Sequence, residues 1–300
     1  MSRAGRDDRI LPETRWVVAL VLLVLVAAFV ILYFWPDNTE QLFAWTIRPR
    51  MTPLLMGAGY LGGAYTLARV LTQRRWHEVG MAFPAIVPFT LFMAGATVLH
   101  WDRFNRGHVT FWLWVAIYAT TPFLLTALWL RNRHADPGGR DPGDPIVPVP
   151  ARRIMAAGGL GCAAVAAFMF LWPAAAIAVW PWQLTPLTAR VVAGWFALSA
   201  GSALMMAREP RWSASRGAAQ GGILFATLLL VAIVRAWSDF NPQNPLSWGY
   251  LALVCGSLLG LLFLQLTLEP PRSLAWVWRR SPSDDLPSLS QRVRGKSSSG

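Results

Sequence analysis

The chain has little charge and few of the side chains that usually carry chemistry. Only 14% of its 300 residues are charged, whereas a soluble domain usually carries about 25%. It has two cysteines and four histidines. Cys162 and Cys255 both fall in apolar stretches, so they form no disulfide framework and are interpreted as small core residues. The shortage of charge predicts that lipid, and not water, surrounds much of the chain.

Long uncharged stretches occupy most of the sequence. A helix that crosses the hydrocarbon core of a membrane takes roughly 20 apolar residues, and eight stretches approach or exceed that length. They are residues 16–34, 51–68, 80–99, 109–130, the stretch from 154, 191–207, 217–234 and 246–268. None has the strict alternation of a membrane β-barrel strand. The first ends in FWPDN, which is no cleavage site, so it is interpreted as a retained helix. The sequence predicts an all-α integral membrane protein with eight transmembrane helices.

Basic residues are distributed unequally between the two sides of the predicted membrane. An even number of spans puts both termini on one side, and that side holds all but six of the 27 Lys and Arg. The positive-inside rule then predicts a multi-pass plasma-membrane protein with cytoplasmic termini. Because the basic residues are scattered over short segments, nucleic acid is excluded as a partner. The expected partners are membrane lipids, with another membrane protein or a second copy of the chain as alternatives.

The second half of the chain repeats the first. Matching residues are 137 positions apart at first and, after a one-residue gap, 136 apart. The clearest match is a motif of three, Trp101, Phe104 and Asn105, which returns as Trp237, Phe240 and Asn241. Since each half has an even number of spans, the two halves have the same orientation in the membrane.

This repeat predicts the organisation of the chain. The predicted parts are a cytoplasmic N-terminal segment (1–15), a first four-span repeat (16–130), a cytoplasmic Pro/Gly-rich linker (131–153), a second four-span repeat (154–268) and a disordered cytoplasmic tail (269–300). Between the first two spans of each half lies an apolar segment bracketed by proline, 36–49 and 173–186. We expect these two segments to form short helices or re-entrant turns along the outer interface.

Polar residues on the predicted outer side are the candidates for a binding site. No charge lies in the middle of a predicted span, which argues against a proton- or sodium-coupled transporter. No motif for a nucleophile or a phosphate loop is present. Arginine is unexpected on this side, because the positive-inside rule places basic residues on the cytoplasmic side. Its guanidinium binds carboxylate or phosphate in a bidentate geometry. The candidate binding residues are Arg48, Arg50, His100, Asp102, Arg103, Arg106, His108, Arg190, Arg235 and Asp239.

These outer residues also have structural interpretations. Asn105 or Asn241 can cap the following span, as can Asn244 before Pro245, and Asp102 and Asp239 can each neutralise a nearby arginine. The Trp–Phe–Asn motif, which both halves share, is interpreted as structural. A metal or haem between His100 and His108 would need their spans to be adjacent, and a metal would need a third ligand as well. We therefore predict no metal and no cofactor.

Three classes of function stay open. The favoured class is binding or transport of a small or lipid-like molecule, including an anionic one, at an outward-facing site between the two repeats. The second is a membrane-embedded enzyme acting on a lipid-linked substrate, with His100 or Asp102 as the general base and Arg103 as an anion clamp. The third is a non-catalytic scaffold or subunit of a membrane complex. The lack of a catalytic signature favours the first class.

Overall fold

The structure, a computed structural model, describes residues 7–269, which are helical apart from their connections. The ten α-helices of this part are α1 (Pro12–Phe34), α2 (Thr39–Leu42), α3 (Met51–Thr72), α4 (Ala82–Leu99), α5 (Val109–Asn132), α6 (Val149–Leu171), α7 (Pro173–Val179), α8 (Pro186–Arg208), α9 (Trp212–Arg235) and α10 (Pro245–Leu268). All but the first residue of the tail predicted at 269–300 lies outside the described residues.

Seven of these helices are long and apolar enough to cross a membrane: α1, α4, α5, α6, α8, α9 and α10. They correspond to seven of the eight predicted spans. Several begin up to five residues before the predicted span, because a helix can include charged or polar residues in its first turn. The chain is a polytopic membrane protein, and the all-helical prediction is confirmed.

Helix α3 has the length of a span without the same apolar character. It has 22 residues, and its sequence includes four glycines, three threonines and Arg69. Residues 51–60, its first ten, are all buried. Other helices therefore surround this half of α3, and glycines along the helix let them approach closely.

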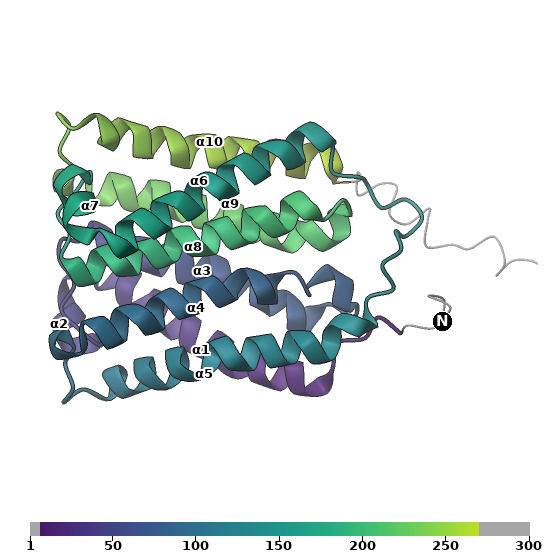
Figure 1. Ribbon diagram of the computed structural model, residues 1–300, viewed down its shortest axis with the longest axis horizontal. Coiled ribbons are helices and arrows are strands. Elements are labelled where there is room, and N and C mark those ends of the chain that lie inside the picture. Colours follow the sequence, from purple (N-terminus) through teal and green to yellow (C-terminus); the bar gives the residue numbers. More distant parts are fainter. Residues whose placement is uncertain (1–6, 270–300) are drawn as a thin grey trace, which may run out of the picture.

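The long helices lie side by side along the longest axis of the molecule (Figure 1). Within the first half α1 packs on α3 and α4 on α5, and within the second half α6 packs on α8 and α9 on α10. Between the halves, α3 packs on α9 and α4 on α8. The short helices α2 and α7 lie at one end of the bundle, and the N-terminal segment and the linker lie at the other (Figure 1).

Aromatic rings fill the centre of the bundle, where the two halves meet. The ring of Trp195 lies 5.0 Å from that of Tyr60 and 4.6 Å from that of Phe89, measured between centroids. The Tyr60 and Tyr118 hydroxyls are 2.9 Å apart. These residues come from α3, α4, α5 and α8, so the core joins the two halves.

Glycines set the closest approach between helices of different halves. A Cβ placed on Gly201 of α8 would lie 2.5 Å from the carbonyl oxygen of Ala85 in α4. A Cβ on Gly221 of α9 would lie 2.8 Å from the carbonyl oxygen of Gly62 in α3. Both pairs of helices therefore touch through their backbones, as close packing of membrane helices through small residues predicts.

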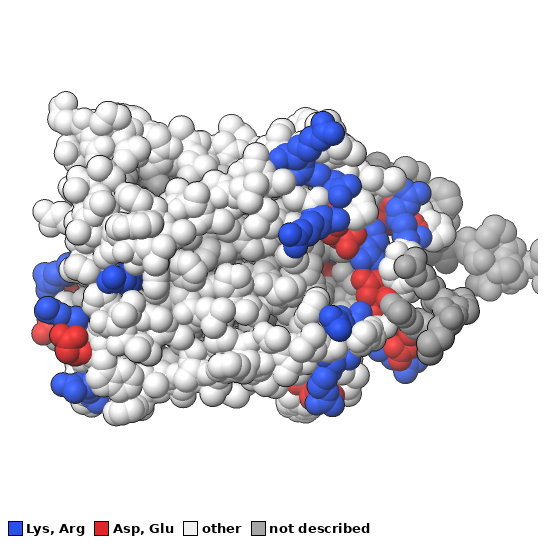
Figure 2. Space-filling view, viewed as in Figure 1, with Lys and Arg blue, Asp and Glu red and all other residues white. Residues whose placement is uncertain are grey.

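Charged side chains gather at the two ends of the molecule. Figure 2 shows, on the face it presents, a wide band without Lys, Arg, Asp or Glu between two charged ends. Such a band is what the hydrocarbon core requires, because an ion at its centre is costly.

Backbone hydrogen bonds in the turns recur at the spacings of the sequence match. Two hydrogen bonds of the first half each have a counterpart in the second half. In each case the two accepting carbonyls are 137 residues apart in sequence and the two donating amides are 136 residues apart. The pairs are Trp76 N to Asp8 O (2.8 Å) with Trp212 N to Pro145 O (3.0 Å), and Asn105 N to Ala44 O (2.9 Å) with Asn241 N to Pro181 O (3.0 Å).

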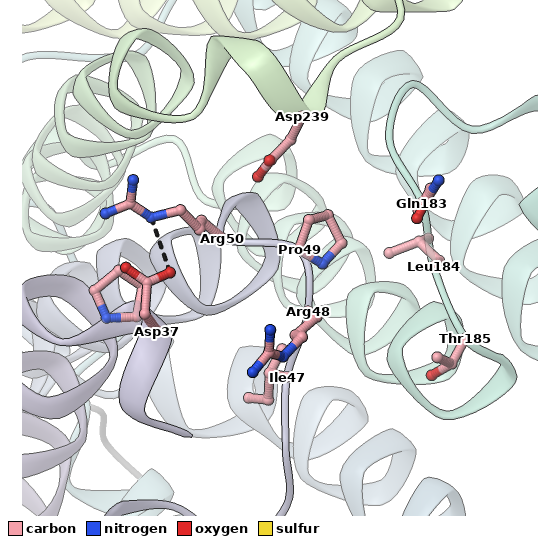
Figure 3. A pocket seen from close by; sticks show the side chains of 10 residues that line it. Asp37, Ile47, Arg48, Pro49, Arg50, Gln183, Leu184, Thr185 and Asp239 are labelled. Atoms are coloured by element: carbon pink, nitrogen blue, oxygen red, sulfur yellow. Dashed lines mark ion pairs between the residues drawn. The ribbon is translucent and has the colours of Figure 1, made fainter. Parts of the chain in front are cut away.

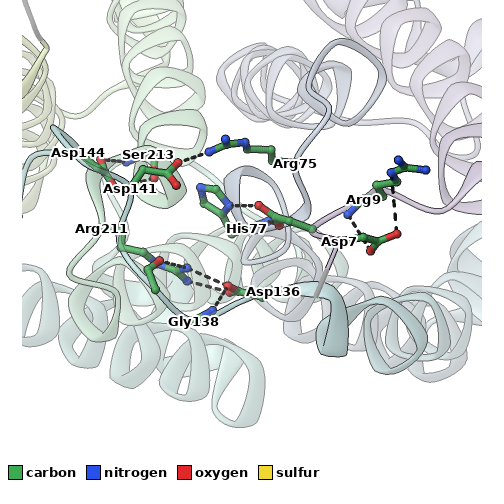
Figure 4. A network of polar contacts seen from close by, with 12 residues as sticks. Asp7, Arg9, Arg75, His77, Asp136, Gly138, Asp141, Asp144, Arg211 and Ser213 are labelled. Carbon is green, nitrogen blue, oxygen red and sulfur yellow. Dashed lines mark hydrogen bonds and ion pairs between the residues drawn. The ribbon is translucent and has the colours of Figure 1, made fainter. Parts of the chain in front are cut away.

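Ion pairs fix the linker against the turns that precede α4 and α9 (Figure 4). The guanidinium of Arg211 donates to both oxygens of Asp136 and to both oxygens of Glu209, each at 2.8 Å. Arg75 pairs with Asp141, and Asp144 accepts from the amide and hydroxyl of Ser213. The linker thus makes more specific contacts than its Pro/Gly-rich composition indicates.

Burial and pairing shift the pKa values of this network. Burial raises the pKa of Asp136, but hydrogen bonds from Arg211 and the Gly138 amide lower it more, so the pKa lies below its usual value. The same pairing raises the pKa of Arg211, whose side chain is only 10% exposed. Both charges of the Asp136–Arg211 pair are therefore kept at neutral pH.

Candidate functional site

A pocket of about 420 Å³ opens at the end of the bundle that carries α2 and α7 (Figure 3). Its size is typical of small-molecule sites. Both halves line it: Pro36, Asp37 and residues 47–50 belong to the first, and Gln183, Leu184, Thr185 and Asp239 to the second. The pocket thus lies between the two halves.

Local structure on each side holds the pocket walls in place. The Ile47 amide donates to the hydroxyl of Thr39 at 2.9 Å, and the Ile47 side chain is buried. This anchor fixes the backbone just before Arg48. On the opposite wall, Thr185 caps α8 through a reciprocal pair of hydrogen bonds with Thr188.

Two of the pocket's four charges neutralise each other. The Nε of Arg50 lies 3.0 Å from Oδ1 of Asp37, with both side chains more than half exposed. Arg48 is exposed, and its guanidinium makes no hydrogen bond or ion pair with another residue in the range 7–269. Arg48 is therefore the cation of this pocket that is available to a ligand.

Asp239 does not neutralise an arginine, so that prediction is wrong. Its Oδ2 accepts from the amide of Met51, the first residue of α3, at 2.8 Å. The first amides of a helix lack partners within the helix, and the side chain of Arg50, the N-cap residue of α3, accepts no hydrogen bond from them. A carboxylate from the other half of the chain fills that role and also suits the positive end of the helix dipole.

Arg190 and Arg235, two of the predicted binding residues, lie away from the pocket lining. The Nε of Arg190 donates to the carbonyl of Phe170 at 3.1 Å, and Nη1 of Arg235 donates to the carbonyl of Tyr33 at 2.8 Å. Phe170 and Tyr33 are 137 residues apart, in the last turns of α6 and α1. Each guanidinium also lies over the ring of the same residue, 5.7 Å and 5.0 Å from its centroid. Both arginines therefore donate hydrogen bonds to carbonyls in the last turn of a helix, where a cation is favourable.

His100 connects the end of α4 to α8. Its Nε2 is 2.7 Å from Nη1 of Arg190. Arginine has no acceptor, so Arg190 donates and the imidazole is neutral. Burial lowers the pKa of His100, and the charge of Arg190 lowers it further. His100 therefore has a structural contact that depends on its neutral form.

The thermal midpoint of the protein is expected to fall as the pH drops below about 6.5, the usual pKa of histidine. The folded-state pKa of His100 is lowered, so the unfolded state binds more protons in this range and stability is lost as the pH falls. In His100→Gln the amide oxygen still accepts from Arg190 but does not titrate. Midpoints measured from pH 7.5 to 5 should fall less steeply for this variant than for the wild type. Equal slopes would contradict this role of His100.

The other predicted site residues are spread over the turn before α5. Asp102 and Arg103 pair at 3.3 Å, but both side chains are about three-quarters exposed. Arg106 is exposed, and His108 faces the hydroxyl of Thr110 at 3.3 Å. Between residues 7 and 269, no group of three His, Cys, Asp or Glu is placed to hold a metal ion.

The caps of α5 and α10 differ from each other. Asn244 caps α10 as predicted, since its side chain accepts from the amide of Leu246 at 3.0 Å. Asn105 and Asn241 cap neither helix, so that prediction is wrong. His108 is the N-cap residue of α5 and makes no side-chain cap, and the Asn241 side chain accepts from the nearby Gln243 amide. The two asparagines contribute instead through their backbone amides.

The aromatic part of the repeated motif packs in both halves. Phe104 and Phe240 are each 5% exposed. Their ring centroids lie 5.1 Å from that of Trp45 and 5.2 Å from that of Trp182, respectively. Trp101 and Trp237 flank these contacts at the surface. The motif therefore holds the turn between two long helices to the segment that precedes α3 or α8.

No protein-family model, no curated protein and no solved structure matches this chain. The site is therefore assigned from its geometry. Of the predicted binding residues, the pocket brings together Arg48, Arg50 and Asp239. Sequence reasoning missed Asp37, Gln183 and Thr185, although they lie within or at the edge of the two segments expected at one interface. The sequence feature that could have identified these three residues is their position in the two segments, because their residue types alone do not indicate a site.

Proposed function

We propose that this chain is a plasma-membrane protein of two four-span repeats that binds or transports a small or lipid-like molecule with an anionic group. The ligand binds in the outward-facing pocket between the repeats. Arg48 carries this proposal, because its guanidinium lines a pocket formed by both halves and has no partner within residues 7–269. A guanidinium is suited to bidentate binding of phosphate or carboxylate.

Several observations support the proposed topology. Helix α3 has the length of a span and lies among the other long helices (Figure 1), which supports its assignment as the eighth. The recurring turn hydrogen bonds and the equivalent pairings of α3 with α9 and α4 with α8 support two parallel repeats. The excess of basic residues at the linker end supports cytoplasmic termini. The pocket then faces outward, at the depth of the lipid headgroups.

Membrane lipids are the partners that this proposal implies. The pocket is lined by charged residues and by the apolar Pro36, Ile47, Pro49 and Leu184, so one ligand can contact both polar and apolar surroundings. A lipid headgroup and a water-soluble anion both meet the requirement of Arg48.

Binding of short-chain phosphatidylglycerol to the full chain in detergent tests this function. Native mass spectrometry would count one-to-one complexes for the wild type, Arg48→Gln and Arg106→Gln. Arg48→Gln is expected to weaken binding about tenfold, the loss of one charge-assisted hydrogen bond. Arg106→Gln is the matched control, since Arg106 is an exposed arginine of the same end outside the pocket. Unchanged binding in Arg48→Gln, or an equal loss in both variants, would refute the proposal.

A further inference from the structure

The charged side chains that line the pocket sum to zero. Arg48 and Arg50 are balanced by Asp37 and Asp239. Since Arg50 and Asp37 pair with each other, the charges left for a ligand are one cation, Arg48, and one anion, Asp239. Figure 3 shows these two side chains on opposite sides of Pro49, and the segment that carries Gln183, Leu184 and Thr185 lies to the right of both in this view.

Asp239 has binding capacity left after its contact with α3. Only Oδ2 is used, by the Met51 amide, and Oδ1 has no hydrogen-bond partner within residues 7–269. A second carboxylate or phosphate near Asp239 would be repelled, whereas an ammonium group would be attracted. The pocket therefore disfavours a ligand that carries several negative charges and no positive one.

We propose that the ligand is zwitterionic, with its phosphate or carboxylate against Arg48 and its ammonium group against Asp239. This inference rests on the proposed function, because it concerns the same pocket. The headgroup of phosphatidylethanolamine and free glycerophosphoethanolamine have the same chemistry and are the two sources to distinguish. Apolar lining from Pro36, Ile47, Pro49 and Leu184 suits the glycerol and the first carbons of a chain.

The variant Asp239→Asn separates the charge of this residue from its structural role. The side-chain oxygen of asparagine is also a hydrogen-bond acceptor, so it still accepts from the Met51 amide while the negative charge is lost. Asp102→Asn is the matched control, because it removes an exposed carboxylate of the same end that does not line the pocket. An unchanged thermal midpoint of Asp239→Asn would show that the cap is kept.

The test compares short-chain phosphatidylethanolamine and phosphatidylglycerol with equal acyl chains on the full protein in detergent. The wild type is expected to bind phosphatidylethanolamine about tenfold more tightly, a preference that Asp239→Asn abolishes and Asp102→Asn keeps. Competition by glycerophosphoethanolamine at equal strength supports a water-soluble zwitterion, and its failure to compete supports a lipid.

Two results would overturn the inference in different ways. If the wild type binds phosphatidylglycerol as tightly as phosphatidylethanolamine, and Arg48→Gln weakens both, the zwitterion inference fails and the proposed function stands. If Arg48→Gln changes neither ligand, both fail. A preference for phosphatidylethanolamine that survives in Asp239→Asn also overturns the assigned role of Asp239.

Discussion

Replacing Arg211 with methionine is expected to lower the free energy of unfolding by about 3–5 kcal/mol, the usual cost of removing one partner of a buried ion pair. The Arg211 side chain is 10% exposed and donates four hydrogen bonds of 2.8 Å to Asp136 and Glu209. Methionine fills much of the same volume but leaves two partly buried carboxylates next to each other. The linker would lose its main anchor to the turn before α9.

Arg75→Met is the matched control for Arg211→Met. Arg75 stands 136 positions earlier, in the turn before α4, and pairs with Asp141 of the same linker. Its side chain and that of Asp141 are 50% and 47% exposed, so its loss should cost only about 0–1 kcal/mol. Unfolding in mixed micelles, followed by tryptophan fluorescence, would give both values. Equal losses in the two variants would contradict the role given to burial.

Replacing Gly201 with leucine is expected to destabilise the protein by about 3 kcal/mol, at the upper end of the usual cost of overpacking. The first side-chain atom alone would lie 2.5 Å from the carbonyl oxygen of Ala85, and 3.1 Å from two further backbone atoms of that residue. Backbone cannot rotate away as a side chain can, so α4 and α8 must separate. Because these helices belong to different halves, their separation also disturbs the packing around Trp195.

Gly161→Leu provides the comparison for Gly201→Leu. Gly161 is exposed on α6, and nothing lies within 4 Å of a Cβ placed there. The same substitution should leave stability unchanged or raise it slightly, since leucine has the higher helix propensity. Thermal midpoints and the yield of folded protein would report both effects. A destabilisation of Gly161→Leu as large as that of Gly201→Leu would mean that helix packing is not the cause.

The long helices were predictable from sequence because contact with lipid restricts which residues can follow one another along the chain. A span facing lipid must be uncharged over its length, so 246–268 almost coincides with α10 (Pro245–Leu268). Asn244 was predictable as the cap of α10 because asparagine directly before a proline is typical of a helix start. Helix α3, predicted at 51–68 by the same rule, continues through Arg69 to Thr72.

The candidate site was predictable only in part, because its contacts join distant segments. Asp239 caps a helix that begins 188 residues earlier, and no local pattern indicates that contact. The outer arginines looked alike in sequence, but Arg235 satisfies a carbonyl of α1, whereas Arg48 lines a pocket. What separates them is the position of helix ends in three dimensions.

A high-resolution structure of the full chain purified in native lipid tests the central claim most directly. The account predicts non-protein density in the pocket between the halves, in contact with the guanidinium of Arg48 and with Oδ1 of Asp239. A pocket closed by protein side chains, or one that holds only water while Arg48 points into solvent, would contradict it.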